Sequence, residues 1–230
     1  MTIIYIILGI ILSIVIILLY VFRNKIFRKK SDTSLLKSSW AKETVDYYKN
    51  KKIKIFINDK YNNEPIVGKR VVKNMTKDEK KEVEKLLRKT MKLSKKGRIN
   101  LQFVDDYHKS TLIITLASMH DLNDLDLYGQ YTDIKVDGKK YLLIVLNPKN
   151  LNVEEDIIKQ NVLHEFGHFL GLKHPFDCSG YCDSQHYGRK YTITDTYMAY
   201  DRDENNFTPK FFTKLDRKAI KEIWDDENYY

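Results

Sequence analysis

The 230-residue sequence predicts an α+β domain that follows an N-terminal apolar segment. Two observations indicate this fold class: short apolar runs typical of strands, and longer segments in which apolar residues recur at helical spacing. The predicted strands cover residues 53–57, 99–104, 111–117 and 141–146, and the predicted helices cover residues 76–96, 152–170 and 215–224. This order describes a mixed twisted sheet with helices packed against it.

The N-terminal segment has the length of a membrane span. Residues 3–22 carry no charge, and 20 helical residues cross roughly the 30 Å of a bilayer core. A cleaved signal peptide fits less well, since no Lys or Arg precedes Ile3 and no Ala occurs before Ala41. We therefore expect a single-pass protein whose anchor covers residues 1–22.

A basic region follows the predicted anchor. Residues 23–52 hold 10 basic and 3 acidic side chains and are predicted to form a juxtamembrane tether, although Leu36 and Val45 also suit a short surface helix. The cluster at residues 23–30 favours the cytoplasmic (or virion-interior) side for the domain, and it also suits contact with anionic headgroups. Residues 99–230 are acidic, and we find no basic stripe with interleaved aromatics, so nucleic acid is not an expected partner.

The folded domain is predicted to begin at Ile53 and to extend to residue 230. Isoleucines at alternate positions in 53–57 indicate a strand with one strongly buried face. Thr76 with Glu79 forms a capping box that begins a long first helix, which we expect to end near Lys96, before Gly97.

The second half of the domain contains a long loop and two further helices. Residues 119–133 are predicted to be mostly loop, between the strands at 111–117 and 141–146. Asn152 with Glu155 begins the second helix, which should end near Leu170. The apolar spacing from Leu215 to Trp224 predicts a C-terminal helix.

The second helix contains the motif HEFGHFLGLKH. His164 and His168 lie one helical turn apart, so both imidazoles can reach one ion about 2.1 Å away. Gly171 permits the left-handed turn that ends the helix and brings His174 back as a third ligand. Three neutral nitrogens leave the fourth position open, which is typical of catalytic rather than structural zinc.

Glu165 follows the first histidine and is the expected general base and acid. It would take a proton from zinc-activated water as that water attacks a carbonyl and pass it to the leaving amine. The alternative is an ordinary core helix with unrelated histidines. Five fixed positions match by chance in such a chain with a probability on the order of 10⁻⁴.

These residues resemble the metzincin clan of zinc endopeptidases, whose signature is HExxHxxGxxH followed by a tight turn that contains Met. The candidate turn is TYMAY, residues 196–200. The resemblance implies that Met198 forms a hydrophobic base under the zinc histidines and that Tyr200 binds near the metal and hydrogen-bonds the developing oxyanion. The alternatives are an ordinary buried methionine and a packed loop tyrosine.

Within the clan the sequence is most similar to serralysin-like and matrixin-like peptidases, over residues 53 to about 228. GLKHPFD and LDRKAIKEIW carry this similarity. The resemblance implies one catalytic zinc ion (Zn2+) and a peptide substrate bound as an extended strand against a sheet edge, for which residues 128–132 are the counterpart. The sequence departs from these families in having no cysteine propeptide switch, no Gly-rich calcium repeats and no cleavable signal.

Two weaker signals lie in loops. His120, Asp121, Asp124 and Asp126 resemble a supplementary metal loop that would bind Ca2+, or else a solvated acidic loop. Cys178 and Cys182 are close enough in sequence to form a disulfide, which would imply an oxidising compartment, in conflict with the positive-inside prediction.

The expected function is that of a membrane-anchored zinc metalloendopeptidase acting on a protein or peptide substrate. Two alternatives remain open: a non-catalytic membrane-tethered binding or assembly protein that retains the metzincin fold, and a zinc amidase acting on a non-protein substrate. Both share the predicted site residues, so the sequence alone does not separate them.

Overall fold

The computed structural model describes residues 33–38, 41–59, 71–73, 75–117, 128–136, 138–146, 155–175, 196–199 and 209–226. The chain divides into two compact units, residues 1–33 and 34–230, and the sheet belongs to the second unit. The predicted anchor lies outside the described residues. Within the described ranges, we find no helix that is both long and apolar enough to cross a membrane.

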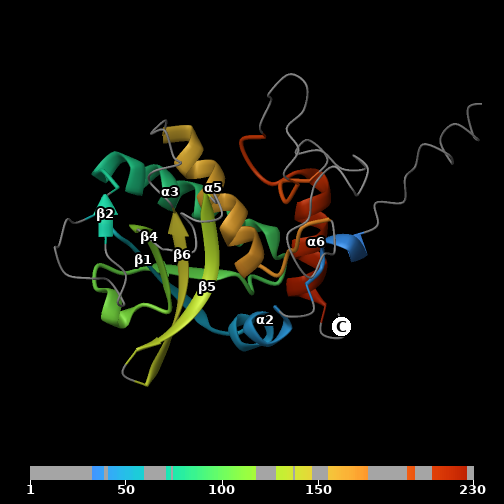
Figure 1. Cartoon of the computed structure of the whole chain (residues 1–230). Helices are drawn as coiled ribbons and strands as arrows, with labels where there is room; N and C mark the ends of the chain where they lie inside the picture. The colour runs from blue at the N-terminus through green and yellow to red at the C-terminus, as the bar shows by residue number, and fades with distance from the viewer. Residues whose placement is uncertain are drawn as a thin grey trace, which may run out of the picture. The chain divides into compact units, whose positions relative to one another are not determined.

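A mostly parallel sheet forms the centre of the second unit (Figure 1). Its strands are β1 (Lys52–Ile57), β2 (Val71–Lys73), β3 (Asn100–Phe103), β4 (Leu112–Ala117), β5 (Gly129–Val136) and β6 (Lys139–Leu146). The strand order is β3-β1-β4-β6-β5, and β2 also pairs with β4. β1 is parallel to β3 and β4, and β4 is parallel to β6, whereas β5 and β2 run antiparallel to their partners.

The four predicted strands are confirmed as β1, β3, β4 and β6. The prediction of a loop over residues 119–133 is wrong at its end, because β5 begins at Gly129. β5 forms a hairpin with β6 through Gly138, whose φ of 78° few other residues adopt. Pairing with β6 therefore makes this segment extended, since its own sequence has no alternating apolar pattern.

Helices and short 3₁₀ turns precede, connect and follow the strands. They are η1 (Thr33–Leu36), α2 (Lys42–Tyr48), α3 (Lys77–Thr90), η2 (Met91–Leu93), η3 (Tyr107–Lys109), α5 (Glu155–Phe169) and α6 (Lys214–Asp225). The predicted capping box at the start of α3 is confirmed, with Thr76 and Glu79 bonded to each other's backbone N–H groups. The α-helix ends at Thr90 rather than near Lys96, because the chain tightens into η2 and Asp225 of α6 accepts the N–H groups of Lys95 and Lys96.

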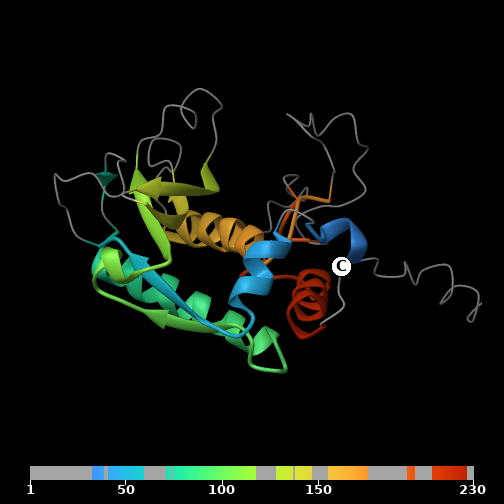
Figure 2. The same ribbon diagram turned by 90° about the horizontal axis from the view of Figure 1, so that it is seen from below.

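The main core lies between one face of the sheet and the helices α3 and α5 (Figure 2). The alternating isoleucines of β1 point into this core, as predicted, and are at most 1% exposed. α5 packs against α3, β5 and β6. This packing places the helix that carries the histidine motif beside the edge strand of the sheet.

The folded unit begins at Ser34, earlier than the predicted boundary at Ile53. Leu36, Ala41 and Val45 are buried, and α2 packs the Tyr48 ring against Phe169 of α5. The described part of residues 34–52 is therefore part of the domain rather than a tether. The sequence favoured a tether because its few apolar residues stand among many charged ones.

Candidate metal centre

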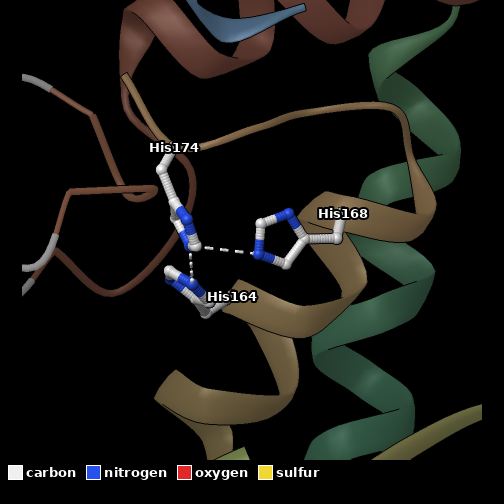
Figure 3. Close-up of side chains that lie close together, drawn as sticks. All are labelled: His164, His168 and His174. Atoms are coloured by element: carbon white, nitrogen blue, oxygen red, sulfur yellow. Dashed lines mark hydrogen bonds between the residues drawn. The ribbon is translucent and has the colours of Figure 1, made fainter. Parts of the chain in front are cut away.

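Three histidine side chains meet at the C-terminal half of α5 (Figure 3). His174 Nε2 lies 3.0 Å from His164 Nε2 and 3.2 Å from His168 Nε2. Three nitrogens bound tetrahedrally about 2.1 Å from one zinc ion lie about 3.4 Å apart. The observed separations are close to this value, so the predicted ligand set fits a single ion.

Backbone carbonyl groups orient two of the three imidazole rings. His164 Nδ1 lies 3.2 Å from the Tyr197 carbonyl oxygen, and His168 Nδ1 lies 3.0 Å from the Leu172 carbonyl oxygen. A carbonyl can only accept, so each Nδ1 donates its proton and each Nε2 keeps a lone pair. Both rings thus present the tautomer that binds a metal through Nε2.

Burial keeps the three imidazoles neutral. It lowers the pKa of His164 to about 3, of His168 to about 4 and of His174 to about 2. For His164 and His174 the neighbouring imidazoles contribute part of this lowering. At pH 7 all three rings are neutral, which is the protonation state that coordinates zinc.

Glu165 is buried between α5 and the edge strand β5. Its side chain is so close to β5 that a Cβ placed on Gly129 would lie 3.4 Å from Glu165 Cγ. Burial raises the pKa of the Glu165 carboxyl to about 8, and a hydrogen bond from the Tyr131 backbone partly opposes this rise. A carboxyl in this setting holds a proton at neutral pH and gives it up when positive charge is placed nearby.

Gly171 ends α5, as the sequence predicts. Its φ of 97° lies in the left-handed region that other residues rarely adopt. The Gly171 N–H donates to the His168 carbonyl, and the Leu172 N–H donates to the Gly167 carbonyl, which closes the helix end. The chain then turns back and brings His174 to His164 and His168.

Met198 packs directly against the backbone of α5. It is fully buried, and a Cβ placed on Gly167 would lie only 2.6 Å from Met198 Sδ. Sequence reasoning missed Gly167, which lets the turn at residues 196–199 approach the helix between the two histidines. The available signal was the glycine itself. Gly inside a helix lowers its stability by about 1 kcal/mol relative to Ala, and such a residue often indicates that another segment packs closely against the helix backbone.

Asp216 holds that turn in place, and sequence reasoning missed this residue too. Its buried carboxylate accepts from Thr196 Oγ1 at 2.5 Å, from the Tyr197 N–H at 2.8 Å and from the Thr213 N–H at 2.8 Å. Burial raises the pKa of Asp216, against the lowering by these hydrogen bonds. Since the Tyr197 carbonyl accepts from His164, Asp216 supports the His164 ring through a single residue. The available signal was the capping box that Asp216 forms with Thr213 at the start of α6.

The structure thus brings together His164, His168 and His174, with Glu165 on the same helix and Met198 beneath it. Other sequence-predicted residues lie outside the described residues: Tyr200, His120, Asp121, Asp124, Asp126, Cys178 and Cys182. No protein-family model matches the chain, and a search of curated proteins finds no match.

Proposed function

We propose that the protein is a zinc-dependent endopeptidase with a metzincin-like catalytic domain, anchored to a membrane through residues 1–22. The convergence of three histidine Nε2 atoms, with His174 within 3.2 Å of the other two, is the observation that carries the proposal. The buried Glu165 on the same helix and the edge strand beside it support peptide hydrolysis in particular.

The three neutral imidazoles suit a zinc ion. His164, His168 and His174 would hold it, and no fourth His, Cys, Asp or Glu belongs to this cluster within the described part of the chain. An open shell of this kind is typical of catalytic zinc. When bound, zinc would act as a Lewis acid that polarises the scissile carbonyl and makes water acidic near neutral pH.

Glu165 is the proposed general base and then general acid. Its carboxylate takes a proton from the attacking water and gives it to the leaving amine. The pKa of about 8 that burial produces suits the second role, and the nearby dication would lower that pKa enough for the first. Burial beside β5 holds the carboxyl in place for both transfers.

β5 is the proposed docking edge for the substrate. It is the last strand in the order β3-β1-β4-β6-β5, and its other edge pairs with β6. An extended peptide can add to such an edge through backbone hydrogen bonds. Because Glu165 Cγ approaches Gly129 of β5, a peptide bound along residues 128–132 would run past the general base.

Met198 and Tyr200 complete the proposed site. Met198 supports the backbone of α5 under the ligands, and Tyr200 would hydrogen-bond the developing oxyanion. The basic cluster after residue 22 favours a catalytic domain on the cytoplasmic (or virion-interior) side.

A peptide-library digestion tests the proposal. The zinc-loaded full chain in detergent is compared with Glu165→Gln, which keeps the shape of the side chain, and with Glu82→Gln on α3 as the matched control. We expect Glu165→Gln to lower the cleavage rate at least 10²-fold with zinc still bound, and Glu82→Gln to cleave normally. Zinc-loaded, folded protein that cleaves no peptide would overturn the proposal.

A further inference from the structure

Residues 36–38, here called the N-terminal strap, pair with the segment between the second and third histidines. Lys37 forms an antiparallel bridge with Leu172. The Ser38 N–H donates to the Gly171 carbonyl at 2.9 Å, and the Lys173 N–H donates to the Leu36 carbonyl at 2.8 Å. Leu36 and Ser38 are buried, so the strap is a fixed part of the domain.

This pairing determines where the Leu172 backbone points. In an extended segment the N–H and C=O groups of successive residues face opposite edges. Gly171 and Lys173, on either side of Leu172, bond to the strap, so the backbone N–H and C=O of Leu172 face α5 instead. The Leu172 N–H donates to the Gly167 carbonyl at 2.9 Å. Its carbonyl accepts from His168 Nδ1 at 3.0 Å.

The strap is also held by side-chain contacts. Lys37 Nζ lies 2.7 Å from Glu222 Oε2 of α6, and both side chains are about one third exposed or less. Directly after the strap, α2 places Val45 Cγ2 within 3.2 Å of where a Cβ on Gly171 would lie. The N-terminal segment therefore covers the turn that leads from His168 to His174.

We propose that the N-terminal strap positions His168 and His174, so that metal affinity depends on a segment located between the predicted anchor and the first strand. This inference rests on the proposed function and adds a mode of regulation to it. A proteolytic cut before Ser34 leaves the strap in the domain, whereas a cut after Ser38 releases the strap and weakens metal binding. The strap is a positioning element and contacts no substrate.

The test measures the zinc dissociation constant of the full chain in detergent by competition with a chromogenic chelator. Ser38→Pro removes the N–H that donates to Gly171, and proline tolerates the extended residue before it. We expect a 10- to 100-fold loss of zinc affinity, the usual effect of losing an outer-shell partner. Ser38→Ala is the matched control: it keeps the N–H, loses a buried hydroxyl that has no hydrogen-bond partner among the described residues, and should bind zinc as the wild type does.

A charge swap provides a second test in case Ser38→Pro does not fold. Lys37→Glu places two carboxylates together, so zinc affinity should fall, and adding Glu222→Lys should restore it. The urea midpoint of the metal-free protein is recorded for each variant. A lower midpoint with unchanged zinc affinity would mean that the strap only stabilises the fold, and would overturn the inference.

The outcomes separate this inference from the proposed function. A wild type that binds zinc but cleaves no peptide refutes the peptidase, while a loss of zinc affinity in the strap variants still supports the positioning role. A wild type that cleaves peptides, with strap variants that bind zinc equally tightly, refutes only the strap. A wild type that binds no zinc overturns both.

Discussion

Replacing Gly167 by alanine tests the packing beneath the three histidines. A Cβ at this position would lie 2.6 Å from Met198 Sδ and 3.3 Å from Phe212 Cε1. Ordinary contacts of this kind are about 3.5–4.0 Å, so the sulfur must move by roughly 1 Å. Met198 is completely buried and has little room to do so.

The sign of the effect distinguishes the clash from helix propensity. In an unobstructed helix, Gly→Ala adds about 1 kcal/mol of stability. Overpacking a buried site costs up to about 3 kcal/mol, so we expect Gly167→Ala to lower the free energy of unfolding by about 2 kcal/mol. Zinc affinity should also fall, because α5 carries His164 and His168 on either side of the contact.

Urea unfolding of the metal-free protein measures the change, and a double variant provides the control. In a Met198→Ala background the obstructing sulfur is gone, so adding Gly167→Ala should raise stability rather than lower it. If Gly167→Ala alone stabilises the protein by about 1 kcal/mol, Met198 does not pack closely on α5, and the reasoning is refuted.

Three further predictions concern the charges and ligands of the site. Because the folded pKa of Glu165 is raised from 4.5 to about 8, the metal-free protein should lose stability as pH rises through this interval. Above pH 6.5 the histidines with lowered pKa values contribute fully, so they do not cause this loss. Glu165→Gln should reduce the loss in urea titrations at each pH, and the buried Asp216, whose pKa is also raised, accounts for any loss that remains. Asp216→Asn should lower the free energy of unfolding by about 2–4 kcal/mol and weaken zinc binding 10- to 100-fold, because the buried donors of Thr196 and Tyr197 lose an acceptor. The exposed control Asp78→Asn should leave stability and zinc affinity unchanged in the same titrations. His174→Ala should weaken zinc binding by more than 100-fold in chelator competition, unlike the exposed His108→Ala, and equal affinities would contradict the ligand assignment.

Local sequence patterns were sufficient to locate the histidine cluster and the main strands. His164 and His168 lie on the same helix face because residues four apart in a helix always do. Gly171 ends that helix because glycine readily adopts a positive φ. The isoleucines of β1 alternate because one face is buried, so periodicity alone located the strand. These features depend on residues close together in the sequence.

Features that depend on distant contacts were missed. β5 has no apolar alternation because it lies at the sheet edge, and its pairing with β6 determines its conformation. Gly167 and Asp216 acquire their roles only when the turn at residues 196–199 reaches α5 and α6. The strap at residues 36–38 is too short for any periodic pattern, and its partner is more than a hundred residues away.

X-ray absorption at the zinc K-edge of the loaded full chain tests the central claim most directly. The account predicts three imidazole nitrogens about 2.0–2.1 Å from zinc, with the remaining position taken by oxygen. His174→Ala should remove one imidazole from this shell. A shell that contains sulfur at about 2.3 Å, or fewer than three imidazoles in the wild type, would contradict the account.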